Sequence, residues 1–151
     1  MAGARVGART PGIGAVALSL AACAAPAPSE ETEAACFDTL GPVIHHTPVE
    51  EPVPVGRDLL IQARVADPCG VFATELLARP EASSAWSVIG MTHVGDTVDG
   101  DSIYQGTIHG PSVTGAAVLY FLRAFDNTAA LNERCAPEAC DADPWRVPVG
   151  A

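Results

Sequence analysis

The strongest constraint on the fold is a period of two in the apolar residues, which recurs along most of the chain. Residues 58–66 show it best, because Leu59, Ile61 and Val65 fall on one face and Arg64 falls on the other. Side chains of a β-strand alternate between two faces, whereas an amphipathic helix repeats every 3.6 residues. The pattern therefore predicts half-buried strands, and no segment shows a convincing helical period.

Seven segments have this strand pattern, and turn-forming residues such as Asp-Pro-Cys-Gly at 67–70 separate them. Short, regularly spaced strands favour a sandwich of two antiparallel sheets. The sequence thus predicts an all-β fold, a seven-strand antiparallel β-sandwich. The expected strands are residues 43–47, 58–66, 72–79, 86–93, 102–109, 116–126 and 145–149. The expected core is Leu59, Ile61, Val65, Tyr104, Ile108, Tyr120 and Leu122.

The most apolar expected strand ends in the run Tyr-x-x-x-Ala-x-Asp-Asn at residues 120–127. Together with residues 42–49, 58–67 and 104–108, this run resembles the strands of bacterial Ig-like or fibronectin type III-like domains. The resemblance implies an Ig-like β-sandwich domain over residues 41–151. It implies no particular activity, because such folds carry many unrelated functions.

The first 22 residues have the features of a secretory signal peptide. Residues 1–9 are short and positively charged, and residues 13–22 form an apolar run. The run Leu-Ala-Ala-Cys at residues 20–23 resembles the lipobox of bacterial lipoproteins. The resemblance implies cleavage before Cys23 and a diacylglycerol on its thiol, so that the membrane is a partner through this lipid. An ordinary signal peptide cleaved nearby is the alternative.

Residues 23–40 carry the expected lipidated cysteine and are rich in Pro, Ala and Glu, which predicts a disordered tether. The lipoprotein resemblance implies the bacterial cell envelope as the location, at the outer membrane or the cell surface. Residues 24–151 contain six arginines, no lysine and all eighteen acidic residues of the chain. So negative a surface repels polyanions, and we expect no nucleic acid partner.

Four cysteines remain after Cys23, and in an exported protein they predict two disulfides. Alternate loops of a sandwich lie at opposite ends, so all four are expected to gather at one end. We favour the pairs Cys36–Cys69 and Cys135–Cys140. Crossed pairings and a zinc site with four cysteine ligands are the alternatives.

The same end is expected to gather several aspartates. Calcium takes six to eight oxygen ligands, which loop carboxylates and carbonyls can supply. A calcium site is therefore one prediction, and aspartates that merely form turns are the alternative. No other cofactor is expected. The residues of the calcium prediction are Asp67, Asp96, Asp99, Asp101 and Asp126, and Asp141 and Asp143 are expected nearby.

No catalytic motif is present in the sequence. The histidines His45, His46, His93 and His109 do not have the spacing of a catalytic triad, and no Gly-x-Ser-x-Gly elbow or phosphate-binding glycine loop occurs. We therefore expect that the protein is not an enzyme.

One strand face remains as a candidate contact surface. Phe121, Arg123 and Phe125 share the face opposite Tyr120, and unless the chain itself covers them they would contact a partner in the envelope. The sequence thus predicts a membrane-anchored lipoprotein that displays a non-catalytic Ig-like binding or structural module. The alternatives are a small carbohydrate-binding or hydrolytic accessory protein, and a pure spacer domain.

Overall fold

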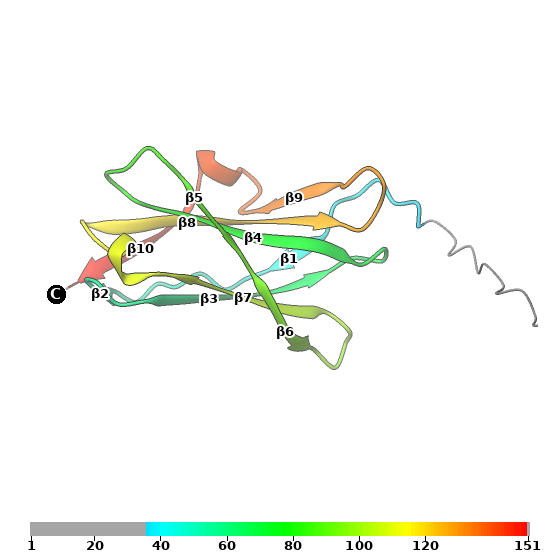
Figure 1. Cartoon of the computed structure of the whole chain (residues 1–151), viewed down its shortest axis with the longest axis horizontal. Helices are drawn as coiled ribbons and strands as arrows, with labels where there is room; N and C mark the ends of the chain where they lie inside the picture. Colours follow the sequence, from blue (N-terminus) through cyan, green and yellow to red (C-terminus); the bar gives the residue numbers. More distant parts are fainter. Residues whose placement is uncertain (1–35, 151) are drawn as a thin grey trace, which may run out of the picture. The chain divides into compact units, whose positions relative to one another are not determined.

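The computed structural model describes residues 36–150, which form a predominantly β structure of ten strands with two short 3₁₀ turns (Figure 1). The predicted signal peptide, the lipidation site Cys23 and the tether up to residue 35 lie outside the described residues. Within the described part, no helix has the length and apolar character needed to span a bilayer.

The first sheet has four antiparallel strands in the order β1-β3-β7-β6. Its strand β3 confirms the predicted alternation, because Leu59, Ile61, Ala63 and Val65 are all buried and the residues between them are more exposed. The strands are β1 (Val43–His45), β3 (Leu59–Ala66), β6 (Thr92–Asp96) and β7 (Ser102–Ile108).

The second sheet has six strands, and β8 lies at its centre. Strand β4 pairs with one edge of β8, while β10 and then β9 pair with the other edge in succession. All pairs are antiparallel except β2 with β10, which is parallel. The strands are β2 (Val53–Pro54), β4 (Val71–Pro80), β5 (Ser87–Gly90), β8 (Ala117–Asp126), β9 (Glu133–Ala136) and β10 (Trp145–Gly150).

Both sheets contribute to one hydrophobic core, with Ile61 and Ile108 from the first sheet and Tyr120 and Leu122 from the second. Each of these four side chains exposes at most 1% of its surface. Six of the seven predicted core residues are buried. The exception is Tyr104, which is only half-buried and packs beside His93.

The strand count corrects the sequence prediction of seven. Residues 86–93 do not form one strand, because the chain leaves the second sheet after Gly90 and joins the first at Thr92. Figure 1 shows this change of sheet as the diagonal green ribbon through β5 and β6. Strands β2 and β9 are additional, and they are too short to show an alternation in the sequence.

Candidate functional site

Four segments meet at one end of the described structure, and we call this the acidic end: residues 36–41, 67–72, 97–101 and 126–132. It lies at the right of Figure 1, where β3, β6 and β8 finish. Hydrogen bonds join three of the segments, and residues 99–101 line one cavity together with residues of the turn at 67–70. The Asn127 amide donates to the Gly70 carbonyl at 2.9 Å, and Asn132 Nδ2 donates to the Asp38 carbonyl at 2.9 Å.

Both favoured disulfides are confirmed. Cys36 is bonded to Cys69 and Cys135 to Cys140, with Cα–Cα distances of 5.5 Å and 5.4 Å. The crossed pairings and the zinc site are thereby excluded, since all four thiols are consumed. The expected gathering at one end does not hold for the Cys135–Cys140 pair, because β9, which contains Cys135, runs back along β8 and carries the chain away from the acidic end. Asp141 and Asp143, which follow Cys140, therefore do not lie at the acidic end either.

The turn between β3 and β4 sets the position of Cys69. Asp67 Oδ1 accepts a hydrogen bond from the Cys69 amide at 2.8 Å, and the Gly70 amide donates to the Asp67 carbonyl at 3.0 Å. Gly70 has φ +83°, a conformation that glycine adopts without strain. Asp67 and Gly70 thus shape the turn that presents Cys69 to Cys36.

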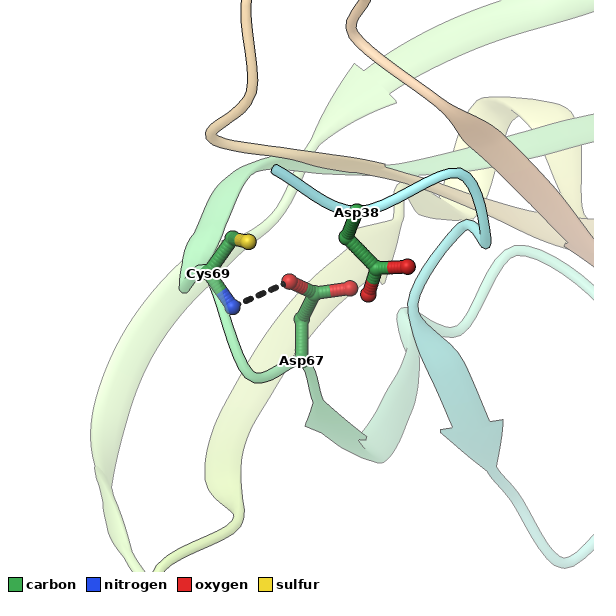
Figure 2. Close-up of side chains that lie close together, drawn as sticks. All are labelled: Asp38, Asp67 and Cys69. Carbon is green, nitrogen blue, oxygen red and sulfur yellow. Dashed lines mark hydrogen bonds between the residues drawn. The ribbon is translucent and has the colours of Figure 1, made fainter. Parts of the chain in front are cut away.

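Two carboxylates face each other beside this disulfide (Figure 2). Carboxylate oxygens of Asp38 and Asp67 and the sulfur of Cys69 all lie within 4.8 Å of one another. Burial raises the pKa of Asp67, as do the negative charges of Asp126 and Asp38, although the bond from the Cys69 amide opposes the shift. The acidic end therefore holds carboxylates under mutual repulsion.

Three of the five aspartates in the calcium prediction line one cavity of about 550 Å³ between the β3–β4 and β6–β7 turns. They are Asp67, Asp99 and Asp101, and Asp101 also lies 3.7 Å from the guanidinium of Arg64. The sequence did not include Asp38, which lies in the segment predicted as tether. Its position two residues after Cys36 was the available signal, because a disulfide at Cys36 brings Asp38 to the same end.

Asp126 belongs to a different, closed arrangement. It is fully buried, and its two carboxylate oxygens accept hydrogen bonds from Thr128 and Asn132. Burial alone would raise the pKa of Asp126, but these hydrogen bonds outweigh it and lower the pKa. Asp126 therefore organises the β8–β9 loop, and its oxygens are already engaged by protein donors.

Asp96 is engaged as well, and the group around it shows why no triad arises. Both His93 Nε2, at 2.9 Å, and Ser102 Oγ, at 3.0 Å, bond to Asp96 Oδ1. In a Ser-His-Asp triad the serine must instead bond to the histidine that removes its proton. These hydrogen bonds lower the pKa of Asp96 and give Ser102 no activating base.

The acidic end supplies only some of the oxygen ligands that calcium needs. The Cys69 sulfur is held in a disulfide, so the tightest group reduces to the two carboxylates of Asp38 and Asp67. Calcium needs six to eight oxygens, and Asp99 and Asp101, which line the same cavity as Asp67, are further carboxylates at this end. Calcium binding stays a prediction.

The chain itself covers part of the candidate contact surface of Phe121, Arg123 and Phe125. Phe121 is only 5% exposed and packs edge-on against Trp86 at a ring distance of 4.9 Å, so it is a packing residue and not a contact residue. Arg123 is half-buried, donates to Glu75 and lies 5.3 Å from the centre of the Phe125 ring. Contact of a partner with Arg123 and Phe125 stays a prediction.

Sequence reasoning missed the role of His46. Its Nδ1 donates to the Gln62 carbonyl at 2.7 Å, and its Nε2 accepts from the Tyr120 hydroxyl at 2.8 Å. The Val49 amide donates to the same hydroxyl at 3.2 Å. This set of bonds, which we call the His46 latch, fastens the chain between β1 and β2 to both sheets. No local pattern signals it, because Tyr120 lies 74 residues away.

No protein-family model matches this sequence, and no curated protein matches it. An assignment of function therefore rests on the residues described above.

Proposed function

We propose that this chain is a lipid-anchored protein of the bacterial cell envelope that displays a non-catalytic Ig-like binding or structural module. The observation that carries the proposal is the pairing of Cys36 with Cys69 and of Cys135 with Cys140. Disulfides persist in oxidising compartments and are rare in the cytosol. Export through the signal peptide predicted at residues 1–22 accounts for such a compartment.

The strand order supports the Ig-like part of the proposal. Ig domains place strands A, B, E and D in one sheet and strands G, F and C in the other, with C′ added in the variable type. The orders β1-β3-β7-β6 and β10-β8-β4-β5 correspond to A-B-E-D and G-F-C-C′. Strands β2 and β9 are additions to this scheme.

The anchor part of the proposal concerns Cys23. Only twelve residues, 24–35, separate Cys23 from the disulfide at Cys36, so even a fully extended chain would span about 40 Å. A lipidated amino-terminal cysteine carries more than one acyl chain, and two chains anchor stably where one is marginal. The module would then stay close to the membrane surface.

The decisive experiment is membrane fractionation of a Cys23→Ala variant, with globomycin treatment of the unchanged chain as a second arm. Both should leave unprocessed precursor or release the protein from the membrane. An Ala24→Ser variant is the matched control and should fractionate like the unchanged chain. Membrane association of Cys23→Ala equal to that of the control would contradict the anchor.

A second experiment separates a binding module from its alternatives. A photo-crosslinking residue at Phe125 should capture one recurrent envelope protein, whereas the same residue at Ser84, on a distant loop, should not. Absence of any recurrent crosslink would favour a spacer domain. Binding to glycans, or hydrolysis of them, would instead favour a carbohydrate-binding or hydrolytic accessory protein.

A further inference from the structure

Exposed apolar side chains gather at the acidic end. Monomeric soluble domains rarely concentrate such side chains without a contact to make. Five large apolar residues at this end, four on its loops and Phe72 near the start of β4, each expose at least 46% of their surface. We call them the apolar rim: Phe37, Leu40, Phe72, Val98 and Leu131.

The loops that carry the rim are fastened to one another. The Cys36–Cys69 bridge holds the segment of Phe37 and Leu40 beside the turn that precedes Phe72. The β8–β9 loop that carries Leu131 is joined to this segment through the bond from Asn132 to Asp38. Val98 belongs to the β6–β7 turn, which shares a cavity wall with the β3–β4 turn. The rim residues therefore lie on neighbouring segments at one end.

The opposite end differs. There the β2–β3 turn meets the end of β10, and the Val55 amide donates to the Gly150 carbonyl at 3.1 Å. On the described loops of that end only Val55 is as exposed as the rim residues, and Leu60, the second residue of β3, is also 56% exposed. The ten residues of β8 extend between the two ends and correspond to about 33 Å of strand. The apolar loops thus distinguish the end at which the chain enters the domain.

We propose that the apolar rim docks the domain onto the phospholipid bilayer that carries its own lipid anchor. The proposal rests on the Cys23 anchor of the proposed function. The length of chain before the domain supports it, because only twelve residues separate Cys23 from Cys36, the residue next to Phe37 of the rim. A short tether converts docking into an intramolecular event with an effective concentration of about millimolar, so weak contacts suffice.

The charges at this end determine which bilayer it fits. Asp38, Asp67, Asp99 and Asp101 lie among the rim loops, and anionic headgroups attract basic segments and repel acidic ones. The fitting surface is therefore zwitterionic phospholipid. An anionic surface weakens the docking.

Tryptophan quenching by brominated phosphatidylcholine tests the proposal. The full lipid-modified chain is reconstituted into zwitterionic vesicles, and its association is checked by flotation. Phe72→Trp places a probe on the rim, and Val55→Trp places a matched probe at the opposite end. The native Trp86 and Trp145 supply the background signal. Brominated lipid should quench the probe at Phe72→Trp and leave the probe at Val55→Trp at background.

Two further arms make the result specific. In the Phe72→Trp chain, the substitutions Phe37→Ser, Val98→Ser and Leu131→Ser should abolish the added quenching, while circular dichroism and the melting temperature report an intact fold. Replacing part of the lipid with phosphatidylglycerol should reduce the quenching. Equal or greater quenching on the anionic vesicles would overturn the assigned surface.

The outcomes separate this proposal from the proposed function. Flotation without added quenching at Phe72→Trp keeps the anchor and overturns the docking. Equal quenching of the Phe72→Trp and Val55→Trp probes also overturns it. A chain that is not lipid-modified and does not float overturns the anchor, and with it the docking.

Discussion

The N-terminal segment of the domain is held in two places, and the two are built from different chemistry. At the acidic end a covalent bond joins Cys36 to Cys69, and Asn132 adds a hydrogen bond to Asp38. About ten residues later, the His46 latch holds the chain through hydrogen bonds alone. The first holding point is sensitive to reduction, whereas the second depends on a neutral imidazole. The comparison shows that one segment can respond to two different changes in its surroundings.

The largest effect is expected from removing the covalent holding point. Cys36→Ala with Cys69→Ala should cost about 2–4 kcal/mol of unfolding free energy, because this bridge restricts a long stretch of the unfolded chain. Cys135→Ala with Cys140→Ala is the matched control, since that pair is only 5 residues apart in sequence against 33 for the first. Urea unfolding of both double variants measures the difference. A larger loss in the control would contradict the prediction.

The next largest effect concerns the latch. Tyr120→Phe removes the hydroxyl that bonds to His46 and Val49 inside the structure, and leaving such partners unsatisfied costs about 1–3 kcal/mol. Tyr104→Phe is the control, because Tyr104 is only half-buried and should lose less. Thermal unfolding followed by circular dichroism distinguishes them. Equal losses would mean that the latch contributes little.

A smaller effect is expected from pH. Burial lowers the pKa of His46 below its ordinary value of 6.5, although the bond to the Gln62 carbonyl opposes this shift. As the pH falls below 6.5, the unfolded chain therefore takes up a proton at His46 before the folded chain does. The stability that the latch contributes is complete above that value and is lost as the pH falls through the folded-state pKa of His46.

The groups around His46 do not reverse the expected loss of stability at low pH. Tyr120 faces it from β8, and burial raises the pKa of Tyr120 to about 12, so the phenol stays neutral throughout. Arg64 on β3 and the neighbouring His45 line the same hollow, and Trp145 of β10 contributes an uncharged ring. A cation such as Arg64 disfavours a second positive charge on His46.

His46→Gln should remove this pH response. A glutamine amide can donate to Gln62 and accept from Tyr120 at every pH, so the unfolding free energy of the variant should depend less on pH below 6.5. His93→Gln is the control, because His93 bonds to Asp96 at the surface. Urea unfolding over a pH series measures the slopes. A slope in His46→Gln equal to that of the unchanged chain would exclude the latch as its source.

The smallest effect concerns calcium at the acidic end. A cation between Asp38 and Asp67 would relieve their repulsion, and ligands that bind only the folded state stabilise it. Millimolar calcium is therefore expected to raise the melting temperature by about 1–3 °C, and EDTA to reverse the rise. Asp38→Asn should lose the response. A melting temperature unchanged by calcium and by EDTA would contradict the calcium prediction.

The fold was predictable from the sequence where burial repeats along one strand. Strands β3 and β8 are long and have a buried face, so their alternation is visible in the residues themselves. The change of sheet at Met91 was not predictable, because residues 86–93 read as one continuous strand. Which sheet each half joins depends on β4 and β7, which lie elsewhere in the chain.

In the candidate site, too, local features were predictable from the sequence and contacts between distant residues were not. The Cys36–Cys69 pair follows from the expected loop positions, and the Cys135–Cys140 pair follows from a sequence separation of only 5. The Asp126 network is local, because its partners lie two and six residues along. The latch between His46 and Tyr120 spans the core and has no sequence signal. Asp38 was assigned to the tether, since only the closed Cys36–Cys69 bridge brings it beside Asp67.

The Cys36–Cys69 bridge also determines how the domain would bear a mechanical load. A pull on the chain from its amino-terminal side reaches Cys36 and passes through the sulfurs to Cys69, between β3 and β4, which are central strands of the two sheets. The three-residue strand β1 is thereby bypassed. With the bridge reduced, the same pull would act on the three-residue strand β1 and on its pairing with β3.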